Sequence, residues 1–190
     1  MENRMKLLVV ALMLMIVASL FAQEAKLTDT GTIELSGAVS YSHYRAPAAD
    51  FSASVFTIAP QVSYFITDAF SVGLTTGLGF LPGVSLVTQS VGEGTTAIQL
   101  FVSPAYHFIL DSKKLFPFIE GQVGLGLVTS GSSSSGLSYG GRAGVKFTPV
   151  DHLVLTFAGQ FVSLRLKQSG LTQRIGWDYW TVGVGVGGYF

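Results

Sequence analysis

Residues 182–190 alternate between apolar and very small side chains, and this alternation constrains the fold more than any other feature of the sequence. The apolar parity consists of Trp180, Val182, Val184, Val186 and Phe190, and the other parity consists of Thr181, Gly183, Gly185, Gly187 and Tyr189. Successive side chains of a β-strand point to opposite faces of its sheet. The segment therefore predicts a strand with one apolar and one nearly bare face, and the alternative is an ordinary buried strand.

Seven further segments show the same kind of alternation. The eight predicted strands are residues 31–44, 54–66, 69–80, 95–110, 115–128, 137–148, 152–165 and 177–190. Each is long enough to cross the hydrocarbon of a bilayer at a steep tilt, which takes about 9–11 residues. The pattern is weakest in 152–165, because Val162 and Leu164 interrupt it.

The connections between these segments alternate in length. Residues 67–68, 111–114 and 149–151 are short turns, whereas 45–53, 81–94, 129–136 and 166–176 are longer and rich in Gly, Ser or Pro. Transmembrane barrels have short periplasmic turns and longer external loops. An even number of strands then places both termini in the periplasm.

The first 22 residues have the pattern of a secretory signal peptide. Arg4 and Lys6 precede an apolar run that ends near Ala22, where we expect cleavage. The run is short for a membrane-spanning helix, which needs about 20 residues, although an uncleaved anchor is the alternative. The chain contains no cysteine, so a lipid-modified cysteine and disulfides are both excluded.

Charge is scarce, and this bears on which face of the strands is buried. Charged residues make up 12% of the chain and the formal net charge is zero, so nothing favours nucleic-acid binding. A soluble eight-stranded barrel needs a solvated outer face, normally rich in Lys and Glu. The polar parity is mostly Gly, Ser, Thr, Ala and Gln, which fits a narrow lumen better. Aromatic residues lie near both ends of the apolar parity, as in the girdles of lipid-facing barrels.

Two hairpin segments and the C-terminal strand resemble the small outer-membrane β-barrel family, the broad group around the OmpX and OmpA barrels. The similar segments are residues 60–73, 116–121 and 182–190. The resemblance implies an eight-stranded barrel with lipopolysaccharide and other outer-membrane lipids around it. It also implies that the barrel-assembly machinery reads Trp180, Val182, Val184, Val186, Tyr189 and Phe190 as an assembly signal. It implies no particular activity.

Four charged residues share the inward parity. They are Glu34, Glu120, Arg142 and Lys146. A charge in a narrow lumen must be paired or hydrated. A hairpin centred near residue 132 places Glu120 close to Lys146, and Arg142 nearer Gln122. We interpret the four as a network that fills the barrel, and the alternative is a gate or a solute path.

The histidines do not form a recognisable site. His43, His107 and His152 have no metal-ligand spacing, and we expect His107 in the lumen, His152 in a turn and His43 at the outer rim. A lipid A-modifying enzyme would need His43 beside a nucleophile. Ser42 is its neighbour in a strand and therefore points to the opposite face.

The sequence thus predicts one domain, residues 23–190, that folds as an eight-stranded antiparallel up-and-down transmembrane β-barrel. We expect a monomeric, non-enzymatic outer-membrane protein without a cofactor, with a structural or surface-interaction role through its external loops. The alternatives are a narrow channel or small-solute carrier and, further off, a lipid A-modifying enzyme.

Overall fold

The computed structural model describes residues 26–46, 51–81, 95–110, 114–130, 132–168 and 174–190, so the expected signal peptide lies outside it. It contains eight strands: β1 (Ile33–Ala46), β2 (Phe51–Thr67), β3 (Phe70–Leu81), β4 (Thr95–His107), β5 (Leu115–Ser130), β6 (Ser132–Phe147), β7 (Leu153–Gln168) and β8 (Arg174–Tyr189). Within these residues no helix is long and apolar enough to cross a bilayer.

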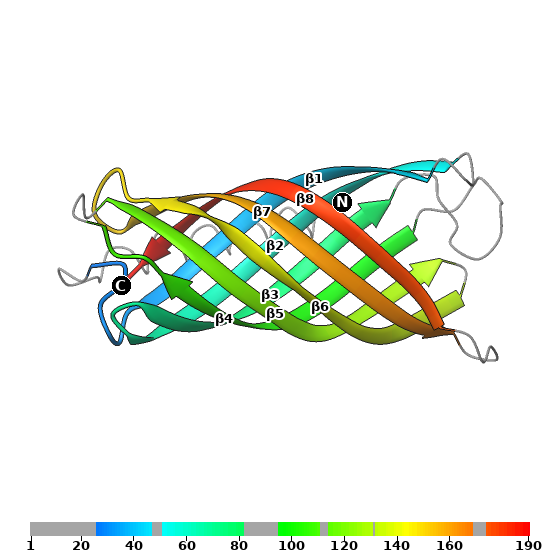
Figure 1. Ribbon diagram of the computed structural model, residues 1–190, viewed down its shortest axis with the longest axis horizontal. Coiled ribbons are helices and arrows are strands. Elements are labelled where there is room, and N and C mark those ends of the chain that lie inside the picture. Colours follow the sequence, from blue (N-terminus) through cyan, green and yellow to red (C-terminus); the bar gives the residue numbers. More distant parts are fainter. Residues whose placement is uncertain (1–25, 47–50, 82–94, 111–113, 131, 169–173) are drawn as a thin grey trace, which may run out of the picture.

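The strands form one closed antiparallel barrel in which sequence neighbours are also neighbours in space (Figure 1). The barrel closes where β1 pairs with β8, and Ile33 and Phe190 exchange backbone hydrogen bonds of 2.8 and 3.0 Å. The predicted fold class is confirmed. We call the end with the connections 67–70 and 148–153 the short-turn end, and the opposite end the distal end.

Several strands run further toward the distal end than the sequence predicts. The prediction of a loop at residues 129–136 is wrong, because β5 continues to Ser130 and β6 begins at Ser132. The two strands remain paired up to Ser130 and Ser132. A serine- and glycine-rich sequence carries little hydrophobic pattern of its own, so the signal for this extension was absent. Pairing to the neighbouring strands supplies the hydrogen bonds that hold it.

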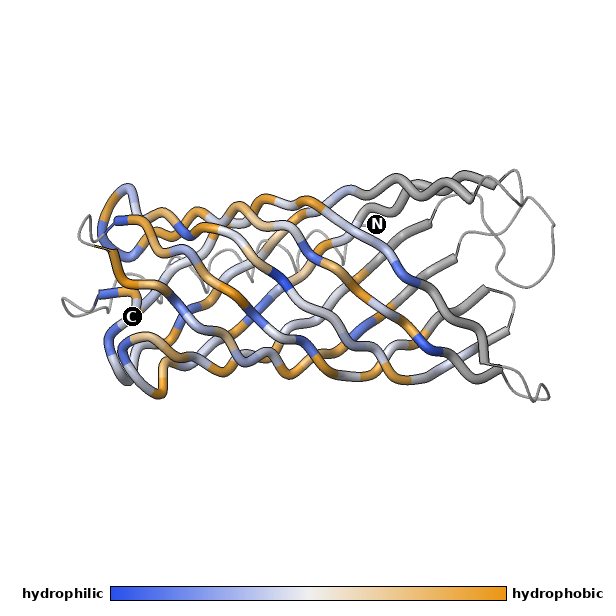
Figure 2. The backbone as a smooth tube through the Cα atoms, in the orientation of Figure 1, coloured by the Kyte–Doolittle hydropathy of each residue, from blue (hydrophilic) through white to orange (hydrophobic). Residues whose placement is uncertain are grey.

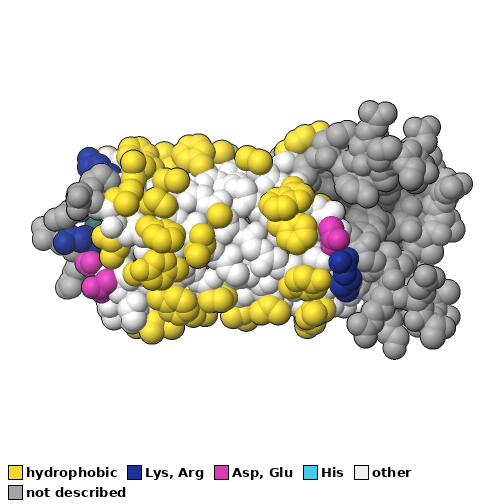
Figure 3. Space-filling model, viewed as in Figure 1, with side chains coloured by type: hydrophobic (Ala, Val, Ile, Leu, Met, Phe, Trp, Pro, Cys, Tyr) yellow, Lys and Arg dark blue, Asp and Glu magenta, His cyan; other side chains and the backbone are white. Residues whose placement is uncertain are grey.

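The alternation of side chains separates an apolar exterior from a polar interior. Figure 2 shows orange and blue alternating along the tube, and Figure 3 shows hydrophobic side chains gathered in bands on the outside. Trp180 and Val182 are each 74% exposed and Leu125 is 67% exposed. The interior instead buries polar side chains such as Gln61 and Ser103. This is the reverse of a soluble barrel, and it suits a protein surrounded by lipid.

Glycines allow the strands to approach closely at the inner wall. A Cβ added at Gly124, Gly140 or Gly144 would overlap a carbonyl oxygen of the neighbouring strand, at Leu100, Phe161 or Phe157 respectively. A Cβ at Gly187 would meet the Leu35 carbonyl oxygen at 2.6 Å. The inward glycines of the sequence pattern are therefore set by the close passage of strands in a narrow barrel.

Candidate functional site

An apolar plug closes the short-turn end of the lumen. It consists of Leu27, Phe65, Phe116, Val154 and Tyr189, each at most 5% exposed. Leu27 comes from the segment before β1, which is held across this end of the barrel. Its contacts include a hydrogen bond from the Gly31 amide to the Phe65 carbonyl (2.8 Å) and one from the Thr30 hydroxyl to Asp68 (2.6 Å).

The first ion pair of the lumen joins β6 to β1. The ammonium of Lys146 lies 2.5 Å from Glu34 Oε2, and the side chains are 2% and 1% exposed. The carboxylate uses one oxygen for this contact, whereas Glu34 Oε1 has no hydrogen-bond partner among the described residues. Among the described residues, Lys146 is therefore the hydrogen-bond partner on which this carboxylate depends.

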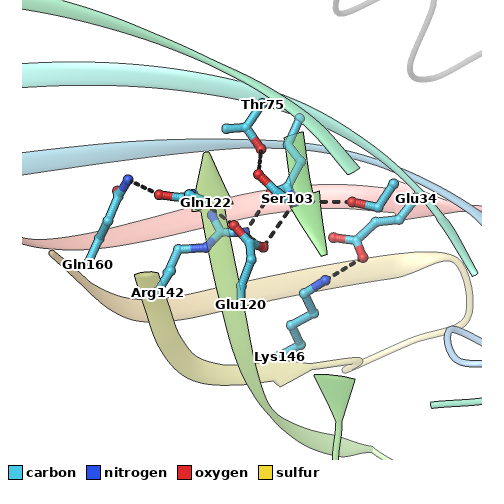
Figure 4. Close-up of polar contacts among 10 residues, drawn as sticks. Glu34, Thr75, Ser103, Glu120, Gln122, Arg142, Lys146 and Gln160 are labelled. Carbon is cyan, nitrogen blue, oxygen red and sulfur yellow. Dashed lines mark hydrogen bonds and ion pairs between the residues drawn. The ribbon is translucent and has the colours of Figure 1, made fainter. Parts of the chain in front are cut away.

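The second ion pair is embedded in a set of amides. Arg142 Nη2 lies 2.7 Å from Glu120 Oε2 and donates to Gln61 Oε1 at 2.5 Å. Glu120 also accepts from the side-chain amides of Gln61 (3.2 Å) and Gln122 (2.8 Å), and Gln160 donates to Gln122 (2.7 Å). Figure 4 shows how Glu120, Gln122, Arg142 and Gln160 line up across the lumen. Four strands are thus connected through buried polar contacts.

The structure brings all four predicted lumen charges inside the barrel, but it pairs them differently from the expectation. The prediction that Glu120 lies close to Lys146 is wrong. The β5–β6 register is centred on residue 131, so Glu120 lies opposite Arg142, and Lys146 lies opposite Phe116. Moving the centre of a hairpin by one residue changes each cross-strand partner by two positions. Glu120 therefore pairs with Arg142, and Lys146 pairs instead with Glu34 of β1.

Phe118 separates the two ion pairs. The Arg142 guanidinium carbon and the Lys146 ammonium each lie 5.3 Å from the centre of its ring, within the range of cation–π attraction. His107 packs against the same ring at 5.9 Å and against Phe65 at 4.9 Å. His107 is completely buried, and neither of its ring nitrogens has a hydrogen-bond partner among the described residues.

These inward aromatic residues were not identified from the sequence. Phe65 shares its parity with Gln61 and Ser63, and Phe118 shares its parity with Glu120. Strand parity was the signal that would have placed them inside. Val162 and Leu164, which interrupt the pattern of β7, are also buried in the lumen. The lumen is therefore not lined by small and polar side chains alone.

A small cavity lies beside the Arg142 cluster. Its volume is about 20 Å³, and its lining includes Arg142, Gln122 and small residues of β1, β7 and β8 such as Ala38, Ala158 and Gly183. That volume holds about one water molecule. The cavity is therefore a hydration space within the packing of the lumen.

The other predicted residues lie apart from the lumen charges. His152 is in the turn before β7 with a positive φ of 65°, and its Nδ1 is 3.0 Å from the Tyr189 carbonyl oxygen. The side chains of Ser42 and His43 lie outside what the structure describes. The described residues contain no group of three or more His, Asp or Glu side chains suited to a metal ion.

The residues of the expected assembly signal divide between the two faces of β8. Trp180, Val182, Val184 and Val186 are exposed on the outside, with Trp180 against Phe161 at 4.8 Å. Tyr189 has the opposite parity and belongs to the plug. Their role in assembly stays a prediction.

Solved structures of small outer-membrane proteins share this architecture. Neisserial surface protein A superposes with a TM-score of 0.58 at 17% identity, over 84% of this chain and 96% of that one. The outer-membrane protein OprG of Pseudomonas aeruginosa gives 0.54 at 13% identity, over 85% and 97%. The N-terminal β-barrel domain of OprF from the same organism gives 0.52 at 17% identity, over 85% and 98%.

The chain has the fold of a small eight-stranded outer-membrane β-barrel. No family model and no curated protein sequence matches it. At these identities the likeness establishes the fold alone, so the role of this barrel has to be argued from its own lumen and surface.

Proposed function

We propose that this chain is an integral outer-membrane barrel with a filled, non-conducting lumen that acts through its distal end. The observation that carries the proposal is the combination of an apolar exterior with an interior occupied by two buried ion pairs and an apolar plug. An apolar exterior of this kind is stable in hydrocarbon. Eight strands enclose a space that side chains just fill, which disfavours a solute path.

The packing of the described residues favours a filled lumen over the channel alternative. The plug covers the short-turn end, and the cavity beside Arg142 has room for about one water molecule. The lipid A-modifying alternative depends on His43, whose side chain lies outside the described residues, and no observation on the described residues favours it. We therefore assign a structural or surface-interaction role to the barrel as a monomer, with outer-membrane lipids, including lipopolysaccharide, against its exterior.

Conductance in planar bilayers tests the filled lumen. We expect no stable current steps from refolded protein whose heat-dependent gel mobility shows that it has folded. The control variant carries Phe65→Ala and Phe116→Ala, which shorten two side chains of the plug. Steady current steps from the unmodified protein would overturn the proposal and restore the channel.

Labelling of single cysteines tests the orientation, because the chain has no cysteine of its own. Val150, in the turn between β6 and β7, is 61% exposed. If both termini are periplasmic, the β6–β7 turn is periplasmic too. We then expect the Val150→Cys variant in intact cells to react with an impermeant maleimide only after the outer membrane is permeabilised. Equal labelling without permeabilisation would place the short-turn end outside the cell.

A further inference from the structure

His107 is a buried titratable group whose side chain takes no part in the two ion pairs. It ends β4 with its imidazole completely buried in the lumen, and neither ring nitrogen has a hydrogen-bond partner among the described residues. The backbone here is fixed, because the His107 amide donates to the Ala69 carbonyl at 2.7 Å and the Phe108 amide donates to the Pro117 carbonyl at 2.8 Å. The imidazole therefore cannot reach water without a change in the packing around it.

The imidazole connects the plug to the ion pairs through ring contacts. Its centre lies 4.9 Å from that of Phe65, a plug residue, and 5.9 Å from that of Phe118, whose ring is inclined by 25° to it. Phe118 in turn lies against the cationic groups of Arg142 and Lys146. A change in the state of His107 therefore acts directly on the packing of Phe65 in the plug.

The charged groups around His107 already balance one another. Glu34 of β1 and the two β6 cations, Lys146 and Arg142, act on the charge of the imidazole. Glu120 of β5 is bound to Arg142, and β2 and β3 carry no charged side chain. Figure 4 shows Lys146 with Glu34 and Arg142 with Glu120. Two carboxylates and two cations leave no net charge, so a further positive charge at His107 has no counter-charge among the described residues of the lumen.

A protonated imidazole does not fit the closed lumen. Both of its nitrogens are then donors and need acceptors. Glu34 Oε1 has no partner among the described residues, but a bond to it from His107 would make one carboxylate the counter-ion of two cations. A buried charge without compensation is strongly unfavourable. Opening of the plug admits water, which supplies acceptors and hydration, so the open state binds the proton and the closed state does not.

We propose that His107 makes the plug acid-sensitive: the short-turn end is sealed while the imidazole is neutral, and protonation of His107 favours an opened, hydrated plug. Histidine suits this role because an imidazole in water changes charge between pH 5 and 8. The proposal rests on the filled lumen given under the proposed function, and it holds for either orientation of the barrel in a membrane.

Two other titratable groups near the plug have to be separated from His107. His152, in the turn before β7, is partly buried and lies against the plug residue Tyr189, with ring centres 5.4 Å apart. Asp68 holds Thr30 through hydrogen bonds that lower the pKa of its carboxyl, so this carboxyl stays ionised above pH 5. Measurements between pH 7 and pH 5 therefore exclude Asp68, and a variant of His152 tests the second imidazole.

Hydrogen exchange of the plug amides measures the opening. The Gly31 amide donates to the Phe65 carbonyl and the Phe65 amide to the Thr32 carbonyl, so both report on this end of the barrel. An imidazole exposed to water has an ordinary pKa near 6.5. If only the open state binds the proton, linkage raises the opening constant about 25-fold between pH 7 and pH 5. The constant is the exchange rate in detergent micelles divided by the intrinsic rate at the same pH.

Three variants are compared with the wild type. His107→Phe keeps an aromatic ring against Phe65 but cannot take up a proton, and His107→Leu is a second uncharged variant. In both we expect the opening constant to change less than twofold over this pH range. The control is His152→Asn, because asparagine tolerates the positive φ of this turn, and it should keep the rise of the wild type. Heat-dependent gel mobility shows whether each variant has folded.

The amides of Val123 and Leu125 in the middle of β5 serve as the reference, and we expect no comparable rise there. The latch is overturned if the wild-type plug amides show no rise, or if the folded His107 variants show the same rise. An equal rise at the reference amides would also overturn it, because acid would then open the whole barrel. Loss of the rise in His152→Asn would assign the effect to His152. Steady current at pH 7 contradicts the filled lumen separately, because these exchange measurements involve no current.

Discussion

The pairing of lumen charges makes a quantitative prediction about stability. Glu34 and Lys146 are at most 2% exposed, and Lys146 contacts Glu34 Oε2 while Glu34 Oε1 has no hydrogen-bond partner among the described residues. Removing one member of a fully buried pair leaves the other charge uncompensated, at a cost of about 3–5 kcal/mol. Lys146→Met and Glu34→Gln should each lower the free energy of unfolding by about that amount.

Arg142→Met should cost less than Lys146→Met. Without Arg142, the Glu120 carboxylate still accepts from the amides of Gln61 and Gln122. Each hydrogen bond to a charged group retains about 1.5–3 kcal/mol. The difference between the two variants therefore reports how much the amides compensate for the lost cation.

Double-mutant cycles in urea, followed by tryptophan fluorescence of barrels refolded into vesicles, measure the coupling. For Glu34→Gln with Lys146→Met we expect a coupling free energy of about 2–3 kcal/mol. For Glu120→Gln with Lys146→Met we expect less than about 0.5 kcal/mol, the level found for independent sites. The reasoning is refuted if the second coupling equals the first, or if both are near zero because water screens the lumen.

Four further expectations follow from the described contacts. Val184→Arg should cost about 2–4 kcal/mol of unfolding free energy in vesicles and Val184→Leu almost nothing, because Val184 faces lipid; similar costs would show that it does not. Gly144→Ala should destabilise the barrel in urea while Gly37→Ala, with no atom within 4 Å of its added Cβ, should not; equal midpoints would contradict the close strand passage. Hydrogen bonds from the Thr30 hydroxyl and amide lower the pKa of Asp68. The contribution of Asp68 to stability is therefore present above the ordinary pKa near 4 and is lost as the pH falls through the lowered pKa. Hydrogen exchange of residues 26–32 should be slower in the wild type than in Asp68→Asn at neutral pH, and the two rates should converge in acid. Phe190→Ser should reduce outer-membrane levels in cells more than it reduces refolding in detergent, and normal cellular levels would exclude a role in assembly.

Strand number, closure and the facing of side chains followed from the period-two pattern, because hydrocarbon outside and a polar lumen inside impose opposite requirements on alternate residues. That pattern placed Glu34, Glu120, Arg142 and Lys146 on the inner parity. It did not define their partners. Which charges pair depends on the register of the β5–β6 hairpin, and an error of one residue at its centre changes the partners. The repeated serines of this turn are equally compatible with neighbouring registers.

The plug and the Phe118 contacts needed the three-dimensional structure for another reason. Leu27, Phe65 and Tyr189 are far apart in sequence, and each is an ordinary apolar residue in its local context. Only the closed geometry shows that they meet. The extent of the β1–β8 pairing, from Glu34–Tyr189 to Tyr41–Val182, was equally hidden, since no local pattern shows where two strands near opposite ends of a chain stop pairing.

The meeting of Leu27 with Tyr189 has a consequence for how the barrel is formed. A sheet that has curled but not closed has no inside, so its plug residues remain in solvent or lipid and Glu34 remains hydrated. Joining Ile33 to Phe190 then buries the plug and dehydrates the Glu34–Lys146 pair in the same event. A half-closed barrel gains neither benefit, and closure should accordingly be an all-or-none transition dominated by contacts between distant parts of the chain, which makes it the slow step of folding.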